Sequence, residues 1–150
     1  MEIQSKQIQT KFHGEIEIHQ DQLWNFPKGI PGFETEKQFA LLPIEGNPNF
    51  QVLQSTTTEA VAFIVTNPYT LVEDYTFDID DPTIELLNIE KPEDIFVLAI
   101  LTLKQPFETS TINLQAPLIF QLNNKTAKQM ILGDNRFKTR HIIGQVKEEV

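Results

Sequence analysis

The stretch DIDDPTIELLNIE carries the densest set of groups that could do chemistry, because it begins like a calcium-binding loop. Asp78 and Asp80 occupy the first and third ligand positions of such a loop. Thr83 then stands where the loop needs glycine for its sharp turn, and Ile89 stands where a bidentate glutamate belongs. The pattern therefore does not predict a calcium site, and another role is needed for these acids.

The other groups that catalyse or bind metals are scattered along the chain. There is no cysteine, which removes disulfides, thiolate metal sites and thiol nucleophiles. His13, His19 and His141 lack the clustered spacing of metal ligands. No serine lies in a G-x-S-x-G elbow, and the GIPG loop is followed by Phe33-Glu34 rather than by the Lys-Ser/Thr of a phosphate loop. The sequence predicts no enzymatic activity, no metal and no cofactor.

The charge is strongly uneven along the chain. The formal net charge is −9, and residues 73–94 hold nine acids against one lysine, a net of −8. Residues 125–140 hold five bases against one acid, a net of +4. An acidic surface repels phosphates and attracts basic proteins, so nucleic acid is a poor partner. The plainer interpretation, that the acids form a solvated face, stays open.

Most of the sequence consists of alternating or β-rich segments. The charges described above must therefore be positioned mainly by strands. We expect strands in the following segments: KQIQTKF and GEIEIH, which form a hairpin through His13-Gly14; 38–44, 50–55, 60–66, 75–79, 94–103 and 110–116; and PLIFQL with KTAKQMIL, which form a hairpin through two asparagines. One helix is expected over DPTIELLNIE, capped by Asp81 and ended by Lys91-Pro92, and a second short one begins at Pro68. The sequence predicts one mostly all-β domain over 1–150, an antiparallel barrel or sandwich.

Nothing in the sequence indicates export or a membrane span. The N-terminal residues are polar and alternating, and the longest apolar run, IFVLAIL, is far short of the ~20 residues that a span needs. We expect a cytoplasmic protein and take a monomer as the default.

The loop FPKGIPGFE holds two prolines and two glycines between aromatic residues. Proline fixes φ and glycine permits a bend, so the loop is predicted to be stiff. Phe26, Ile30 and Phe33 could anchor it or present a preformed binding edge. A plain corner would have the same composition, so the loop alone does not decide between them.

An ordered set of segments resembles the flagellar assembly factor FliW family. FPKGIPGFE, FVLAILTL and INLQAPLIFQLNNKTAKQMIL follow one another as in that family, together with FHGEIEI, FQVLQS and AFIVTNPYTLVEDYTFDI. The resemblance runs from about Ile8 to Ile143, and the specific signal is the order of the segments rather than any one of them.

The resemblance implies a non-enzymatic regulator that binds two proteins. Members bind flagellin, as a chaperone does, and bind CsrA, a basic RNA-binding repressor, away from its RNA surface; this relieves repression of flagellin mRNA translation. Charge complementarity then suggests a CsrA contact on the acids. Residues 133–150, a candidate C-terminal tail, are expected to add to this contact through Phe137, Ile142 and Ile143 as apolar anchors. The candidates are Glu73, Asp74, Asp78, Phe137, Arg140 and Ile142 for CsrA, and Phe26, Ile30 and Phe33 for flagellin.

Two alternatives stay open from the sequence. Phe137, Ile142 and Ile143 could complete the core of the domain instead of anchoring a partner. The barrel could also bind a small molecule or carbohydrate, although Trp24 and two tyrosines offer few rings for stacking on a sugar.

Overall fold

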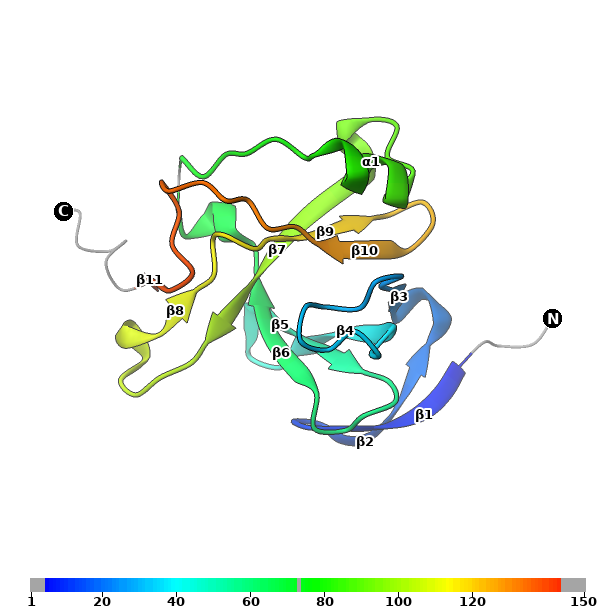
Figure 1. Cartoon of the computed structure of the whole chain (residues 1–150). Coiled ribbons are helices and arrows are strands. Elements are labelled where there is room, and N and C mark those ends of the chain that lie inside the picture. Colours follow the sequence, from blue (N-terminus) through cyan, green and yellow to red (C-terminus); the bar gives the residue numbers. More distant parts are fainter. Residues whose placement is uncertain (1–4, 73, 144–150) are drawn as a thin grey trace.

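The computed structural model describes residues 5–72 and 74–143, and most of their regular structure is strand (Figure 1). The strands are β1 (Ser5–Thr10), β2 (Gly14–His19), β3 (Leu23–Asn25), β4 (Gln38–Ile44), β5 (Asn47–Ser55), β6 (Ala62–Thr66), β7 (Ile95–Thr102), β8 (Thr111–Ile112), β9 (Leu118–Gln121), β10 (Thr126–Gln129) and β11 (His141–Ile142). The α-helix is α1 (Asp81–Leu87), and 3-10 turns span Gln20–Gln22, Pro68–Thr70, Pro92–Asp94 and Phe107–Thr109.

The large sheet closes on itself through β7, the strand that changes neighbours along its length. Residues Ile95–Leu98 pair with β9, whereas Ala99–Leu101 pair with β6 and Leu101–Thr102 with β8. The order β7-β6-β5-β4-β3-β10-β9 therefore returns to β7, and β8 and β11 extend outside this ring. One pair is parallel, between β3 and β10, and the others are antiparallel. The barrel-like β fold expected from the sequence is confirmed.

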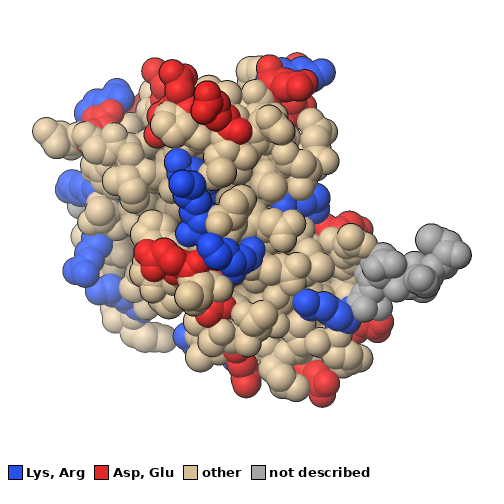
Figure 2. Space-filling view, turned by 45° about the vertical axis from the view of Figure 1, so that its right-hand side comes forward, with Lys and Arg blue, Asp and Glu red and all other residues tan. Residues whose placement is uncertain are grey.

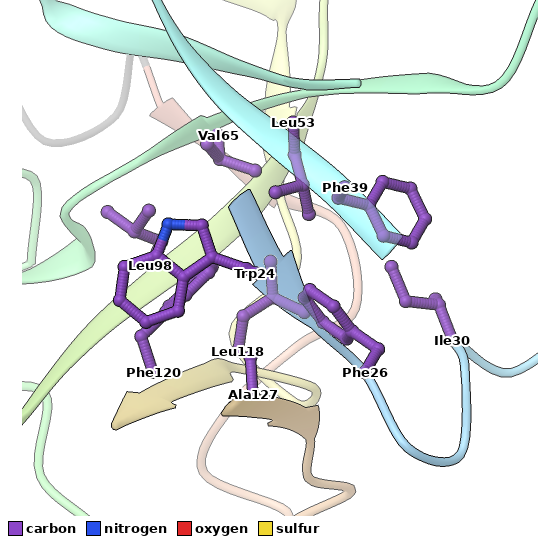
Figure 3. Close-up of a cluster of buried hydrophobic side chains, with 10 residues drawn as sticks. All are labelled: Trp24, Phe26, Ile30, Phe39, Leu53, Val65, Leu98, Leu118, Phe120 and Ala127. Atoms are coloured by element: carbon purple, nitrogen blue, oxygen red, sulfur yellow. The ribbon is translucent and has the colours of Figure 1, made fainter. Parts of the chain in front are cut away.

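The interior of this ring is filled by side chains (Figure 3). Trp24 stands edge-on to Phe120 at 4.9 Å between centroids, and Phe26 stands edge-on to Phe39 at 5.1 Å. Such aromatic pairs add ~0.5–1.5 kcal/mol each beyond their buried area. The cluster is completed by Ile30, Leu53, Val65, Leu98, Leu118 and Ala127.

Three further layers cover the outside of the barrel. The β1–β2 hairpin packs Ile8 and Ile18 on strands β4 and β5. Helix α1 packs Leu87 on Ile119 of β9 and on Met130. A third cluster joins residues that follow β6 to residues in the last described part of the chain. Its members include Leu71, Val72, Tyr75 and Phe77 on one side and Leu132, Phe137 and Ile143 on the other.

Helix α1 begins and ends differently from the sequence expectation. Asp80, not Asp81, is the N-cap, and its carboxylate accepts from the backbone N of Thr83 at 3.0 Å. The helix ends at Leu87 because Asn88 adopts the left-handed conformation, with φ of 59°, several residues before Lys91-Pro92. Among residues 5–72 and 74–143, no helix is long and apolar enough to cross a membrane.

Two predicted strands are corrected by the structure. Residues 75–79 alternate between buried and exposed positions, but they form no ladder, because alternation reports which way side chains face and not whether the backbone pairs. The strand predicted over 110–116 is only Thr111–Ile112. It stops where Asn113 Oδ1 accepts from the backbone N of Gln115 at 3.0 Å and of Ala116 at 3.2 Å.

The predicted β9–β10 hairpin is present, but its strained residue is not an asparagine. Lys125 has the positive φ of 57°. Its ammonium lies 3.9 Å from the Trp24 ring centroid and donates to the backbone oxygen of Asp21 at 2.7 Å. These contacts hold the hairpin against β3.

Candidate functional site

The loop FPKGIPGFE is a fixed corner with one exposed ring. Phe26 and Ile30 are buried, at 0% and 2% exposure, so they anchor the loop and are not accessible to a flagellin-sized partner in this conformation. Phe33 is 39% exposed and stands edge-on to Phe63 at 5.3 Å. Of the three residues expected to bind flagellin, Phe33 is therefore the one on the surface.

Glycine is required at the tightest point of this loop. Gly29 has φ of +65°, and a Cβ there would lie 2.7 Å from the backbone of Glu34. The Glu34 carboxylate accepts from the backbone N of Gly32 at 3.1 Å, and this bond lowers the pKa of Glu34. The buried Phe26 and Ile30, the close approach at Gly29 and the Glu34 hydrogen bond therefore fix the conformation of the loop.

The acidic stretch before α1 lies beside the C-terminal segment. Asp74 and Asp78 are exposed, and Glu73 lies outside the described residues. Tyr75, between them, is buried at 2% exposure and donates its hydroxyl to the backbone oxygen of Leu114 at 2.6 Å. Burial raises the pKa of Tyr75 above its ordinary value, and the nearby Tyr69 adds to this. A buried tyrosine thus holds the exposed acids in place.

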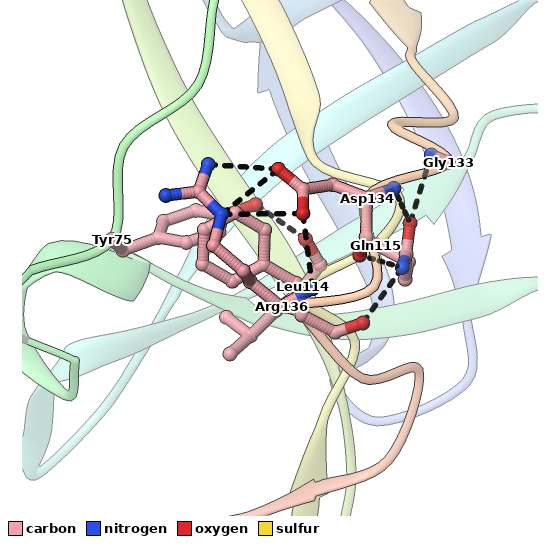
Figure 4. A network of polar contacts seen from close by, with 7 residues as sticks. Tyr75, Leu114, Gln115, Gly133, Asp134 and Arg136 are labelled. Atoms are coloured by element: carbon pink, nitrogen blue, oxygen red, sulfur yellow. Dashed lines mark hydrogen bonds and ion pairs between the residues drawn. The ribbon is translucent and has the colours of Figure 1, made fainter.

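One amide side chain, that of Gln115, makes several of the hydrogen bonds that hold the C-terminal segment (Figure 4). Gln115 Nε2 donates to the backbone oxygens of Asp134 and of Phe137, the latter at 2.7 Å. Its Oε1 accepts from the backbone N of Gly133 at 2.9 Å and of Asp134 at 3.3 Å. The sequence reasoning missed this residue, because its partners are about twenty positions away and no local pattern marks them.

The side chains of this segment divide between core and surface. Ile143 is 5% exposed and Phe137 is half-buried against Tyr75, so these two complete the core, which was the alternative left open by the sequence. Arg140 is exposed, and Ile142 is 42% exposed on the two-residue strand β11. Residues 133–143 are therefore packed on the body of the domain, and the rest of the predicted tail lies outside the described residues.

Charges of both signs meet where these two segments adjoin. Arg136 pairs with Asp134 at 2.8 Å, and its guanidinium lies 5.0 Å from the Phe137 ring centroid. The pKa of Arg136 is raised, chiefly by its hydrogen bond to Asp134 and, more weakly, by the charge of Asp74. Figure 2 shows acidic side chains gathered along the top of the molecule, the level at which Figure 1 places α1, with basic side chains below them.

A buried carboxylate, also missed from the sequence, locks the loop after β5. Glu36 is 9% exposed and accepts hydrogen bonds from three hydroxyls: Ser55 at 2.5 Å, Thr57 at 3.2 Å and Thr58 at 2.8 Å. These bonds, led by that from Ser55, lower the pKa of Glu36. Thr57 and Thr58 of the loop that follows β5 thus bind this carboxylate.

An apolar groove beside α1 is the third feature that the sequence did not reveal. It measures about 480 Å³, and apolar side chains from four segments make most of its lining: Phe77, Ile79, Ile84, Ile89, Pro92 and Ile95. Asp78, Glu90 and Lys91 also line it. The sequence marks the walls of this groove separately, by the alternation over 75–79 and by the apolar positions of α1. No local pattern shows that these two segments lie side by side.

The comparisons with known proteins agree with one another. The model of the FliW protein family matches residues 6–143. The flagellar assembly factor FliW of Bacillus velezensis is 49% identical over 137 residues, covering 91% of this chain and 96% of its own. That of Bacillus subtilis is 47% identical over 137 residues, with the same coverage.

A solved structure has the same fold. The crystal structure of the flagellar assembly factor FliW superposes with a TM-score of 0.89 at 41% identity, covering 97% of this chain and 100% of that one. The family match over residues 6–143 spans the residues of the large sheet, of the Phe26–Glu34 corner and of the C-terminal segment up to Ile143. This chain belongs to the FliW family of flagellar assembly factors.

Proposed function

We propose that this protein is a non-enzymatic cytoplasmic regulator that binds CsrA and flagellin in turn. When flagellin accumulates it occupies the protein and leaves CsrA free to repress flagellin mRNA. When flagellin is exported, the protein is released, binds CsrA away from its RNA surface and relieves the repression. The protein acts as a monomer and also shields flagellin before export.

The proposed binding of CsrA is supported chiefly by the position of Asp74 beside the C-terminal segment. Tyr75 packs on Phe137. The charge of Asp74 raises the pKa of Arg136, so this exposed acid lies near the C-terminal segment. Arg140 and Ile142 are exposed on that same segment. An RNA-binding repressor presents lysine and arginine, which such acids attract. A fixed surface of this kind loses little conformational entropy on binding.

For flagellin, the exposed ring of Phe33 on its stiff loop supports a contact. Its ring is already held by Phe63, so a partner can pack on it without ordering the loop first. Phe26 and Ile30 contribute by holding that loop, since both are buried.

The test is direct binding of the purified chain to CsrA and to flagellin, measured separately by size exclusion and interferometry. We expect a complex with each, and a CsrA complex that weakens as salt is added, because exposed charges are screened within about 10 Å at 0.1 M salt. Absence of both complexes at micromolar concentrations would refute the proposal.

The carbohydrate-binding alternative receives no support from the barrel. Trp24, Phe26 and Phe120 point into its interior and are at most 3% exposed, so the rings that a sugar would need are already packed on one another (Figure 3).

A further inference from the structure

The groove beside α1 has a wall that the helix terminus itself builds. The backbone N of Ile89 donates to the oxygen of Ile84 at 3.0 Å and that of Asn88 to Glu85 at 3.3 Å, around the left-handed Asn88. This is the Schellman arrangement, which brings the residue after the left-handed position towards the last turn of the helix. Ile84 and Ile89 both line the groove as a result.

This wall is held to the barrel by two amide side chains, the buried Gln121 and the exposed Asn124. Gln121, 1% exposed, donates from Nε2 to the backbone oxygens of Leu87 at 3.2 Å and Asn88 at 3.0 Å. Asn124 Nδ2 donates to the same Leu87 oxygen at 3.0 Å. The carbonyls at the end of α1 are thereby satisfied, and the groove is preformed rather than assembled on binding.

The floor is continuous with the core, and the surroundings are acidic. Phe77, Ile79 and Ile95 are half-buried and pack against the cluster of Leu87 and Ile119. Residues 77–95 hold seven acids against Lys91 alone, a net of −6. Asp78 and Glu90 line the groove itself and are exposed.

Its shape selects the kind of occupant. Small-molecule sites enclose most of the ligand surface and add a few convergent polar groups. This groove is shallow, open to solvent and largely apolar, with charges at its margin. An apolar centre with a charged rim is the anatomy of a protein interface, where a few buried side chains carry most of the binding energy.

We propose that this groove receives a leucine-, isoleucine- or phenylalanine-sized side chain from a polypeptide segment whose flanking residues are lysine or arginine. The inference rests on the proposed function in taking a basic protein as the partner, and it adds an apolar anchor to a contact so far argued from charge. Ile84, Ile89 and Phe77 supply the apolar contact, while Asp78 and Glu90 attract the flanking cations.

The first arm of the test measures CsrA affinity for Ile84→Ser and Ile89→Ser in the full chain. We expect each to weaken binding about 30-fold, the size of a hot-spot loss, and Ile89→Leu to retain most of the affinity. The matched control is Ile131→Ser, because Ile131 is 63% exposed and does not line the groove. Unchanged affinity in both groove variants would overturn the inference while leaving CsrA binding intact.

The second arm needs no variant and no CsrA. The unmodified chain is titrated by NMR with a short peptide that carries leucine between arginines, and with the same peptide carrying serine in place of leucine. We expect amide shift changes at residues 77–95 with the leucine peptide and markedly smaller ones with the serine peptide. Equal responses to the two peptides, or shifts confined to other residues, would contradict an apolar anchor, whether or not CsrA binds and whether or not the serine variants fold.

Discussion

The ring of Tyr75 stands edge-on to the ring of Phe137, with 4.8 Å between their centroids and 81° between their planes. This contact joins the extended segment that leads to α1 with the segment that ends the described chain. Tyr75 also reaches Leu114 through its hydroxyl, so three stretches far apart in the sequence meet at one side chain. The exposed acids on either side of Tyr75 take their positions from that junction.

Tyr75→Phe should lower the free energy of unfolding by about 1–3 kcal/mol. The ring contacts remain, but the buried backbone oxygen of Leu114 loses its hydroxyl donor, and leaving such a group unsatisfied has a cost of this size. Urea unfolding measures the change. Tyr69→Phe is the matched control, because Tyr69 is 43% exposed, and an equal loss there would show that the Leu114 bond is not the cause.

Gln115→Ala should loosen the C-terminal segment more than any surface substitution. Four hydrogen bonds to residues 133–137 are lost together, and each contributes about 0.5–1.5 kcal/mol, so we expect a loss of roughly 2–6 kcal/mol. Hydrogen exchange should show faster opening at Gly133 and Phe137. Gln7→Ala, at an exposed position of β1, should leave both measurements unchanged, and unaltered protection in the Gln115 variant would refute this role.

Reversing Asp74 and Asp78 to lysine should weaken CsrA binding about tenfold or more, chiefly through a slower association rate. Exposed charges steer encounter more than they hold a complex together, so the dissociation rate should change less. Glu15→Lys on β2 is the control for a charge reversal outside this surface, because Glu15 is also exposed. Flagellin binding should change less than CsrA binding; an equal loss for both partners would indicate a shared surface or a misfolded variant.

Glu36→Gln should lower stability at neutral pH by about 1–3 kcal/mol, because hydrogen bonds to a charged acceptor are stronger than those to an amide. The pKa of Glu36 is lowered in the folded state, so its contribution is present above the unfolded pKa of about 4.3 and is lost as pH falls through the folded value. The difference between wild type and variant should therefore shrink near pH 3. Urea titrations at both pH values measure it, with the exposed Glu45→Gln as control; a difference independent of pH would exclude ionisation as its source.

Local patterns predicted the parts of the fold that depend on local physics. The alternation in GEIEIH corresponds to β2, because a strand with one face in the core needs that period. The segments at 38–44 and 94–103, rich in β-forming residues, correspond to β4 and β7. Pro82 placed the start of α1 correctly to within one residue. The end of α1 was predicted too late, since it depends on a left-handed Asn88, which asparagine adopts in few contexts.

The features that the sequence did not predict depend on contacts between distant segments. Gln115, Glu36 and Gln121 look like ordinary surface polar residues in the sequence, and their roles follow from partners that only the closed sheet brings near. Phe26 and Phe33 have the same residue type and flank the same loop, yet one is buried and one is exposed. Phe26 packs on Phe39 and Phe120 inside the barrel, whereas Phe33 packs on Phe63 at the surface.

The closure of the sheet through β7 has a consequence for how copies of this chain behave at high concentration. An unpaired strand edge is a template on which further chains can add, and aggregation begins there. Here the large sheet closes on itself through β7, and the strand at its end, β11, is two residues long. In the described part of the chain, the six-residue strands of the β1–β2 hairpin are therefore the longer edges on which a further strand could add.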